Sequence, residues 1–414
     1  MWYKRWLSPS PEVGINSEFE RQIITKVLRR IVTRGILILD FGQGIKDVIG
    51  DDTGAPVVVR PPRLLHLLNI LINPTMRCGE SYMKGEWRIQ QGDLSTLLAM
   101  FLMQEGTLFA PYKRGKKVSR PLRFIFNQYI VPTISRRRCA VHYNISPDVY
   151  KTFLDQDMVY SCAFFEDGDT LETAQGRKLK TTAARLDLTV PGLSVLDIGC
   201  GWGALTRLLA KDHAAHVTGL SLAQGQIEWC NMMRAELPLA GGSLSYHCQD
   251  YKDFGKPGHT WFDRIVSVGM FEHIGIGQYG HFFRYVHDFL KPGGKVLVHT
   301  IVRPQPGREN PWLDRYIFPN GYIPSLGEIL NPAEASGLLI SDVFLHSSHH
   351  YRITIREWRK RYQSNFDNSP LKENPTMRRM LDFYLASVEQ LFDDSTFGFQ
   401  VAQLKLTKPR VNMY

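Results

Sequence analysis

Apolar runs and helical patterns alternate along the C-terminal part of the chain. Short apolar segments bounded by turn residues predict buried strands, the clearest at residues 194–198, 216–220, 264–268 and 295–301. A helical pattern follows the first of these strands at residues 204–210. Because strands alternate with helices, residues 139–414 are predicted to form an α/β domain with a doubly wound sheet.

The pattern before residue 106 is different. It predicts helices at residues 18–32, 64–71 and 94–103, and short strands at residues 36–40 and 57–60. These elements indicate a small α+β domain over residues 1–105. Residues 106–138 indicate a linker, because they are interrupted by the helix and strand breakers Pro111, Gly115, Pro121 and Pro132.

Charge is distributed unevenly along the chain. Residues 1–150 contain 22 Lys and Arg against 12 Asp and Glu, whereas the remainder contains 28 of each. The excess is densest between Lys113 and Arg138, where basic clusters flank the aromatic and apolar residues 124–131. Such a segment suits an anionic lipid surface. A solvated linker around a core segment is one alternative, and nucleic acid is another, although no nucleic-acid-binding motif accompanies the charge.

Several classes of protein are not expected from this sequence. No apolar region of a signal peptide follows the basic start, and no run approaches the roughly 18 apolar residues of a membrane span. The six cysteines have no CxxC or other paired spacing. We therefore expect free thiols in a reducing cytoplasm, without disulfides and without a metal site.

The most informative motif is D-I-G-C-G-W-G at residues 197–203, between a predicted strand and a predicted helix. A glycine turn at this place lets a cofactor approach the backbone closely. The motif is neither a phosphate-binding loop nor the G-x-G-x-x-G of dinucleotide-binding proteins. It resembles the first motif of class I S-adenosylmethionine (SAM)-dependent methyltransferases, which implies their Rossmann-like, doubly wound, seven-stranded sheet. Another Rossmann-like use is the alternative.

Further segments narrow the resemblance. They are M-V-Y-S-C-A-F-F (158–165), V-T-G-L-S-L-A-Q-G-Q (217–226), Q-D-Y (249–251), S-V-G-M-F-E-H-I (267–274), V-H-T-I (298–301), Y-I-F-P-N-G (316–321) and H-Y (350–351). In this order they closely resemble the cyclopropane-fatty-acyl-phospholipid synthases and the related mycolic acid cyclopropane synthases. G-E-S-Y-M-K-G-E-W (79–87) is similar to the N-terminal domain of the bacterial phospholipid enzymes.

The resemblance implies transfer of the SAM methyl group to a cis double bond of a phospholipid acyl chain. An alkene is a weak nucleophile, so the sulfonium supplies reactivity and the protein supplies placement. Methyl transfer leaves a carbocation, and a base must remove a proton before the ring closes. The resemblance implies that this base is a bound bicarbonate. The positions that hold it map onto Cys162, Glu272, His299, Tyr351 and the backbone amide of Ile301.

Each of these residues has a structural alternative. Cys162 could be a small buried hydrophobe, His299 a core histidine, and Glu272 a carboxylate at a helix start. Tyr351 is crowded by neighbouring histidines and could face solvent. Tyrosine, histidine and an amide can donate hydrogen bonds to an anion. An ionised Glu272 cannot, so it either orients His299 or accepts the bicarbonate proton.

The resemblance also implies the cofactor site. The residues are Tyr160, Ser161, Asp197, Gly199, Cys200, Gly201, Ser221, Leu222, Gln226, Asp250 and Tyr251. The glycines are expected against the SAM methionine moiety with Asp197 supporting the turn, Tyr160 and Ser161 close to the sulfonium, and the last two residues at the adenine. No acidic residue ends the 216–220 strand to hold the ribose hydroxyls, an absence that the family shares.

We therefore predict a SAM-dependent cyclopropane-fatty-acyl-phospholipid synthase. It is expected to be cytoplasmic, peripherally associated with the inner face of the cell membrane, and homodimeric, with no nucleic-acid partner. The alternatives are a methyl or methylene branch on the same lipid, small-molecule N-methylation, and a lipid-binding protein without catalysis. The sequence leaves acyl chain length, double-bond position and headgroup open.

Overall fold

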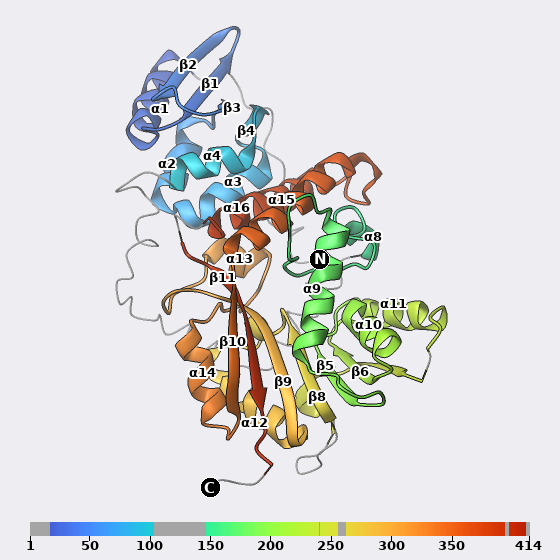
Figure 1. The fold of residues 1–414 in the computed structure, drawn as a ribbon. Coiled ribbons are helices and arrows are strands. Elements are labelled where there is room, and N and C mark those ends of the chain that lie inside the picture. Colours follow the sequence, from blue (N-terminus) through green and yellow to red (C-terminus); the bar gives the residue numbers. More distant parts are fainter. Residues whose placement is uncertain (1–16, 103–145, 240, 256–261, 394–396, 411–414) are drawn as a thin grey trace. The chain divides into compact units, whose positions relative to one another are not determined.

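The computed structural model describes residues 17–102, 146–239, 241–255, 262–393 and 397–410 (Figure 1). It divides into two compact units. Unit 1 comprises Met1–Val118, Asn310–Ile317 and Trp358–Phe397, and unit 2 comprises Ser119–Glu309, Phe318–Glu357 and Gly398–Tyr414. The predicted linker 106–138 lies outside the described residues. The division into an N-terminal domain that ends at residue 105 and a catalytic domain that begins at residue 139 stays a prediction.

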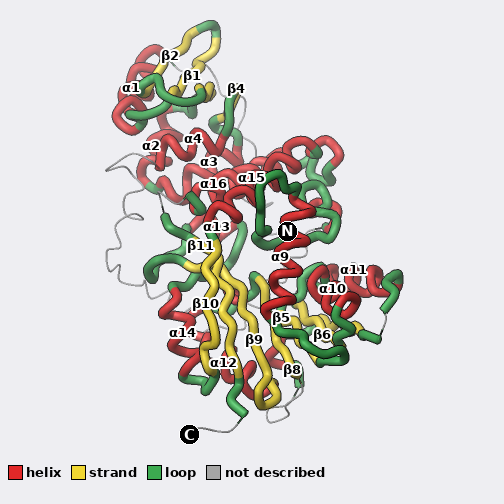
Figure 2. The backbone as a smooth tube through the Cα atoms, viewed as in Figure 1, coloured by secondary structure: helices red, strands yellow, loops and turns green. Residues whose placement is uncertain are grey.

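Unit 2 is built on a seven-stranded sheet in the order β10-β11-β9-β8-β5-β6-β7 (Figure 2). The strands are β5 (Ser194–Ile198), β6 (His216–Ser221), β7 (Ser243–Cys248), β8 (Phe262–Val268), β9 (Leu290–Val302), β10 (Leu339–His346) and β11 (Gln400–Thr407). Strands β5 to β9 pair in parallel, whereas β11 pairs antiparallel with both β9 and β10. The predicted seven-stranded, Rossmann-like α/β sheet is confirmed.

Helices cover both faces of this sheet. They are α9 (Leu171–Arg185), α10 (Ala204–Asp212), α11 (Gln224–Ala235), α12 (Tyr279–Phe289) and α14 (Leu326–Glu334). The short helix α8 (Pro147–Tyr150) and the start of α15 (Ser348–Ser364) also belong to unit 2. Successive side chains of a strand point to opposite faces, and β5 shows it: Leu196 packs with α12 and α14, whereas Val195 packs with α9, α10 and α11. Burial on both sides explains the continuous apolar runs of the central strands.

Unit 1 contains the predicted α+β domain, a sheet in the order β2-β1-β3-β4 with four helices beside it. Its elements are α1 (Glu18–Ile31), β1 (Ile36–Gly42), β2 (Ile45–Gly50), β3 (Pro56–Arg60), α2 (Leu64–Ile72), α3 (Pro74–Lys84), β4 (Arg88–Gln91) and α4 (Leu94–Leu102). Two helices from much later in the chain, α13 (Pro311–Tyr316) and α16 (Pro375–Leu391), complete the unit. The Tyr82 hydroxyl of α3 donates to Asp382 of α16 over 2.9 Å.

Gly79 in α3 gives a stability prediction. Alanine usually stabilises a helix by about 1 kcal/mol relative to glycine. At Gly79, however, a Cβ would lie 2.5 Å from Trp312 Nε1 and 2.8 Å from Phe383 Cε1. Gly79→Ala should therefore destabilise unit 1 by roughly 1–3 kcal/mol.

The matched control is Gly176→Ala in α9, where a Cβ would meet no atom within 4 Å. This change should raise stability slightly, by about 0.5–1 kcal/mol. Urea unfolding of both variants, followed by tryptophan fluorescence and circular dichroism, measures the difference. Equal stability of Gly79→Ala and the wild type would show that α3 is not held closely against α13 and α16.

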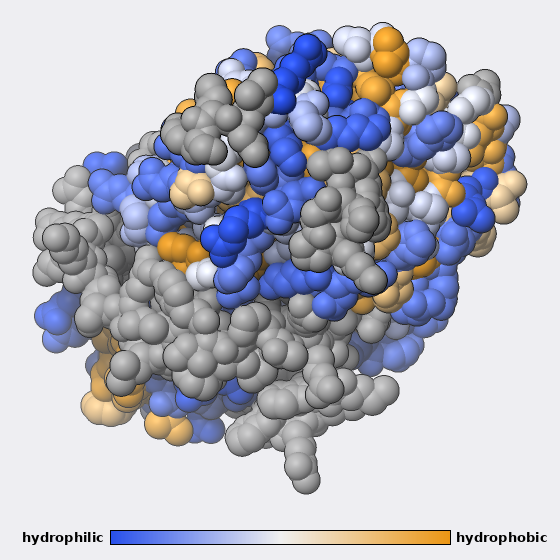
Figure 3. Space-filling model, turned by 90° about the horizontal axis from the view of Figure 1, so that it is seen from below, coloured by the Kyte–Doolittle hydropathy of each residue, from blue (hydrophilic) through white to orange (hydrophobic). Residues whose placement is uncertain are grey.

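None of the helices among the described residues is both long and apolar enough to cross a bilayer. On the side drawn in Figure 3, hydrophilic residues predominate among the coloured atoms, and hydrophobic residues gather in small groups.

Candidate active site

A cavity opens at the carboxyl ends of the parallel strands of unit 2, the usual ligand position in an open α/β sheet. We call it the strand-end cavity. All eleven predicted cofactor residues line it, namely Tyr160, Ser161, Asp197, Gly199, Cys200, Gly201, Ser221, Leu222, Gln226, Asp250 and Tyr251. Their individual contacts with a ligand stay predictions.

The glycine turn forms one wall of the strand-end cavity. Gly199 has φ +86°, and a Cβ there would lie 2.6 Å from Met270 Cβ, so no side chain fits. Gly201 has φ +55°, and a Cβ there would meet no protein atom within 4 Å. The amides of Gly199 and Cys200 both donate to Leu220 O over 2.9 Å, which fixes the turn to β6. Gly201 therefore leaves open space where backbone and ligand can meet.

The predicted cofactor residues in the loops after β6 and β7 form hydrogen bonds with one another and with nearby backbone amides. Ser221 Oγ donates to Gln226 Oε1 over 2.7 Å and accepts from the Ala223 amide over 3.2 Å. Asp250 caps the short helix after β7, accepting from the Lys252 amide over 2.9 Å. The loops after β6 and β7 are thus held in place by the residues predicted to meet the cofactor.

A buried cation that the sequence did not reveal also lines the cavity. Lys178 of α9 is 2% exposed, and its Nζ donates to Ser161 Oγ over 2.9 Å. Burial lowers the pKa of Lys178 to about 8, while nearby Asp155 and Asp197 act in the opposite direction. Burial raises the pKa of Asp197 to about 7, opposed by Lys178. One wall of the cavity therefore carries the Lys178 ammonium and the Asp197 carboxyl group, and the protonation of each depends on the charge of the other.

The five residues predicted to hold a base do not line the strand-end cavity. They lie beside it in connected groups. Glu272 Oε1 accepts from the Ile301 amide over 2.7 Å, which brings β9 against the short helix η4 (Phe271–His273). Cys162, Phe164 and Val401 form a buried cluster, and Tyr351 packs against it. We call these four residues the Cys162 cluster.

Electrostatics connect these groups. Burial raises the pKa of the Tyr351 hydroxyl, and Cys162 and Glu272 are close enough to act in the same direction. Burial also raises the pKa of the Cys162 thiol, which stays neutral and donates to Ala163 O over 3.3 Å. Burial raises the pKa of Glu272, opposed by the Ile301 amide. Four predicted residues are therefore close neighbours, and Cys162 is not a thiolate nucleophile.

His299 lies on β9, 2% exposed, with its Nδ1 3.0 Å from Gln403 Nε2. Its ring stacks at 6.1 Å from that of Phe164, a member of the Cys162 cluster. The Gly269 amide, on the wall of the strand-end cavity, donates to His299 O over 2.9 Å. The fifth predicted residue is thus also beside the cavity.

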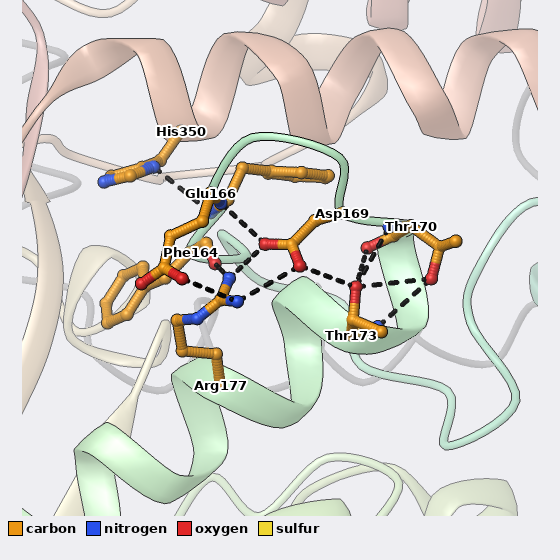
Figure 4. Close-up of polar contacts among 8 residues, drawn as sticks. Phe164, Glu166, Asp169, Thr170, Thr173, Arg177 and His350 are labelled. Atoms are coloured by element: carbon orange, nitrogen blue, oxygen red, sulfur yellow. Dashed lines mark hydrogen bonds and ion pairs between the residues drawn. The ribbon is translucent and has the colours of Figure 1, made fainter.

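The loop after Cys162 is held by the contacts of Figure 4. Arg177 donates to Phe164 O over 2.9 Å and forms ion pairs with Glu166 and Asp169. Thr170 and Thr173 form a capping box at the start of α9. The Phe165 amide donates to His350 Nδ1 over 3.2 Å. This hydrogen bond ties the loop to the residue that precedes Tyr351 in the chain. Local contacts therefore hold both Cys162 and Tyr351 where they meet.

Comparison with known proteins identifies the family of this chain. The family model described as mycolic acid cyclopropane synthetase matches residues 132–404. This chain belongs to that family. Within it, the cyclopropane-fatty-acyl-phospholipid synthase of Escherichia coli (strain K12) is 31% identical over 336 residues, covering 80% of this chain and 83% of the relative.

Two further members of the mycolic acid cyclopropane synthetase family are informative. Tuberculostearic acid methyltransferase UfaA1 of Mycobacterium tuberculosis (strain H37Rv) is 30% identical over 393 residues, covering 89% of this chain and 88% of the relative. The crystal structure of mycolic acid cyclopropane synthase CmaA1 complexed with SAH and CTAB superposes with a TM-score of 0.60. It is 29% identical, and the match covers 66% of this chain and 98% of that one. The present chain is a SAM-dependent fatty acyl methyltransferase.

Proposed function

We propose that this family member is a cyclopropane-fatty-acyl-phospholipid synthase, which adds a methylene group to the cis double bond of an unsaturated phospholipid acyl chain. The observation that carries the proposal is a buried carboxylate oxygen at the site. Glu272 Oε1 accepts from the Ile301 amide, and the Thr300 hydroxyl lies close to the same carboxyl group, but Oε2 is buried and has no partner at hydrogen-bond distance among the described residues. A buried acceptor without a partner is costly and calls for an explanation, such as a catalytic role or a bound water or ion.

The residues around the strand-end cavity fit SAM. Gly201 leaves open space at the wall, and Lys178, Asp197 and Ser161 supply charged and polar groups for the ends of a zwitterion. Bound SAM supplies a methyl group on a positively charged sulfur. The part of the protein is to hold the acyl double bond in line with that methyl group and to exclude water from the resulting carbocation.

The residues beside the cavity fit bicarbonate. Glu272 Oε2 would accept its hydroxyl hydrogen, and Tyr351 and His299 carry hydrogens that a buried anion needs, whereas the Cys162 thiol would supply another only by turning away from Ala163 O. Bound bicarbonate supplies a proton acceptor next to the carbocation. A neutral thiol and a neutral phenol suit this task, because neither competes for the acyl chain as a nucleophile.

The branching reaction is the second candidate, since the tuberculostearic acid methyltransferase is as similar to this chain as the Escherichia coli synthase is. The two reactions share the methyl transfer and differ afterwards. Removal of a proton from the transferred methyl group closes the ring. A 1,2-hydride shift before that step would move the cation to the methyl-bearing carbon, where loss of a methyl proton gives a methylene branch. Reduction of that new double bond by an external hydride donor gives a methyl branch.

The test incubates the purified protein with SAM and vesicles of unsaturated anionic phospholipid, followed by mass spectrometry and proton NMR of the fatty acids. A mass gain of one CH2 with cyclopropane protons and no vinyl signal supports the proposal. The same gain with vinyl protons identifies a methylene branch, and a saturated chain with an added methyl identifies reductive branching. No lipid product despite SAM binding would reject both candidates.

We propose, further, that unit 1 helps a cytoplasmic enzyme bind the inner face of the cell membrane. Leu65, Leu68 and Ile72 of α2 are 67%, 45% and 82% exposed. Their spacing places them on one side of the helix, where apolar side chains can enter the interface of a bilayer. The basic residues between Lys113 and Arg138 would add attraction to anionic lipid.

Replacing Leu65, Leu68 and Ile72 together by serine should weaken cosedimentation with anionic vesicles at least roughly tenfold, because three exposed apolar side chains are lost. The control replaces Leu339 and Leu345 of β10, which are also exposed. Binding that stays unchanged would reject a membrane role for α2. A change in mass by light scattering, without a change in vesicle binding, would instead assign this face to the proposed homodimer.

A further inference from the structure

Gln403 of β11 occupies a completely buried position between His299 and α9. It is 0% exposed. Its Nε2 lies 3.0 Å from His299 Nδ1 and donates to Thr182 Oγ1 over 3.2 Å. Its Oε1 accepts from Arg185 Nη1. The same oxygen lies 3.3 Å from His346 Nε2.

The amide of Gln403 has only one orientation that satisfies these contacts. A guanidinium can only donate hydrogen bonds, so the atom facing Arg185 must be the amide oxygen. The amide nitrogen then faces His299. An amide nitrogen can only donate, so His299 Nδ1 must accept, and in a neutral imidazole the proton is then on Nε2.

We propose that Gln403, oriented by Arg185, is a positioning residue that holds His299 in the neutral Nε2–H tautomer. This inference rests on the proposed function for its consequence. With its proton on Nε2, His299 can donate to a bound anion and cannot itself take the proton of the carbocation. His299 would then donate a hydrogen bond to the anion, and the anion would accept the proton.

The charged and titratable groups around His299 favour the neutral ring. Burial is the largest cause that lowers the pKa of His299. Lys178 and Arg185 of α9 and His346 of β10 lower it further. The pKa of His346 is itself lowered to about 4 by burial and by Arg185. If His299 were an imidazolium, its Nδ1–H would point at the amide N–H of Gln403, and the two donors would repel each other.

The experiment replaces the amide by a carboxylate of nearly the same shape. In Gln403→Glu the introduced carboxylate can pair with Arg185 but can only accept from His299, so the ring proton moves to Nδ1. Nitrogen-15 NMR of histidine-labelled protein, without SAM or lipid, distinguishes the two tautomers. The His299 signals are assigned from a His299→Asn variant.

Activity provides the second readout. At neutral pH, Gln403→Glu should form product roughly 100-fold more slowly, because a wrong histidine tautomer removes the required donor. The carboxylate also raises the pKa of His299, so the ring becomes an imidazolium with an Nε2–H at lower pH. The ratio of variant to wild-type rate should therefore rise as the pH falls, whereas a merely structural defect would keep that ratio constant.

Two further variants keep the test decisive. Gln403→Met removes both amide groups, and should leave His299 as a mixture of tautomers with an intermediate rate. Gln390→Glu is the matched control, a buried glutamine of unit 1 that donates to Ser95 Oγ, and should leave the His299 signals unchanged. A wild-type ring protonated on Nδ1, or a Gln403→Glu ring still protonated on Nε2 alone, would overturn the inference.

The two proposals fail separately. The tautomer is measured on the protein alone, so the expected NMR result would stand even if the lipid product were branched. Conversely, a cyclopropane product with the other tautomer would reject only the role of Gln403.

Discussion

Glu272→Gln should bind SAM as tightly as the wild type and form product at least roughly 100-fold more slowly, because it removes one proton acceptor from the site. The Ile301 amide can only donate, so it fixes the carbonyl oxygen of the new amide at the position of Oε1. The NH2 group then occupies the position of Oε2, where a donor replaces an acceptor. A hydroxyl hydrogen of bound bicarbonate would have no partner there.

The control for this variant is Glu309→Gln. Glu309 is half-buried and, like Glu272, accepts from a backbone amide, that of Ile323, over 2.9 Å; it also accepts from Arg303 over 2.8 Å. Its replacement should affect stability more than product formation. SAM affinity by calorimetry and initial rates at several bicarbonate concentrations separate the effects. A Glu272→Gln enzyme with the wild-type rate would remove Glu272 from the proton path.

The central strands could be predicted from the sequence because they are buried on both faces. Strand β5 and residues 296–302 of β9 are mostly apolar for this reason. Strand β10 could not, since most of its side chains are at least partly exposed. Strand β11 is buried but carries polar residues, among them Gln403, whose hydrogen-bond partners lie far away in the sequence.

Helix α9 could not be predicted for a related reason. Its buried side includes Gln175, Lys178 and Thr182, which do not give an apolar stripe. These residues are polar because Lys178 and Thr182 line the strand-end cavity, while Gln175 donates to Ser161 O over 2.9 Å. Because polar residues of the cavity occupy the buried side of this helix, the helix lacks the apolar stripe by which it could be predicted. Such departures from the usual hydrophobic pattern are expected at functional sites.

The cofactor residues and the base-holding residues differ in how far the sequence alone can lead. Gly199 and Gly201 belong to one strand–turn–helix unit, so their use follows from local chemistry. Cys162, Glu272, His299 and Tyr351 come from separate elements, and only a family resemblance can join them. Lys178 and Gln403 belong to neither group, because each is identified by contacts between distant elements.

Gly201→Ala should weaken SAM binding by roughly 10- to 100-fold, equivalent to about 1.4–2.8 kcal/mol, while the protein stays folded. With φ at +55°, an alanine here is strained by about 1–3 kcal/mol. Its Cβ would meet no protein atom within 4 Å, so it would take space that the strand-end cavity leaves for a ligand. The affinities for SAM and S-adenosylhomocysteine should fall together.

Gly168→Ala separates strain from obstruction. Gly168 also has a left-handed conformation, with φ at +83°, and an added Cβ would meet no atom within 4 Å, but this residue does not line the cavity. Both variants should lose similar unfolding free energy, because both place alanine in the same backbone region. Only Gly201→Ala should lose SAM affinity in calorimetric titration. If the two variants bound SAM equally well, the open space beside Gly201 would not be the place where the cofactor meets the turn.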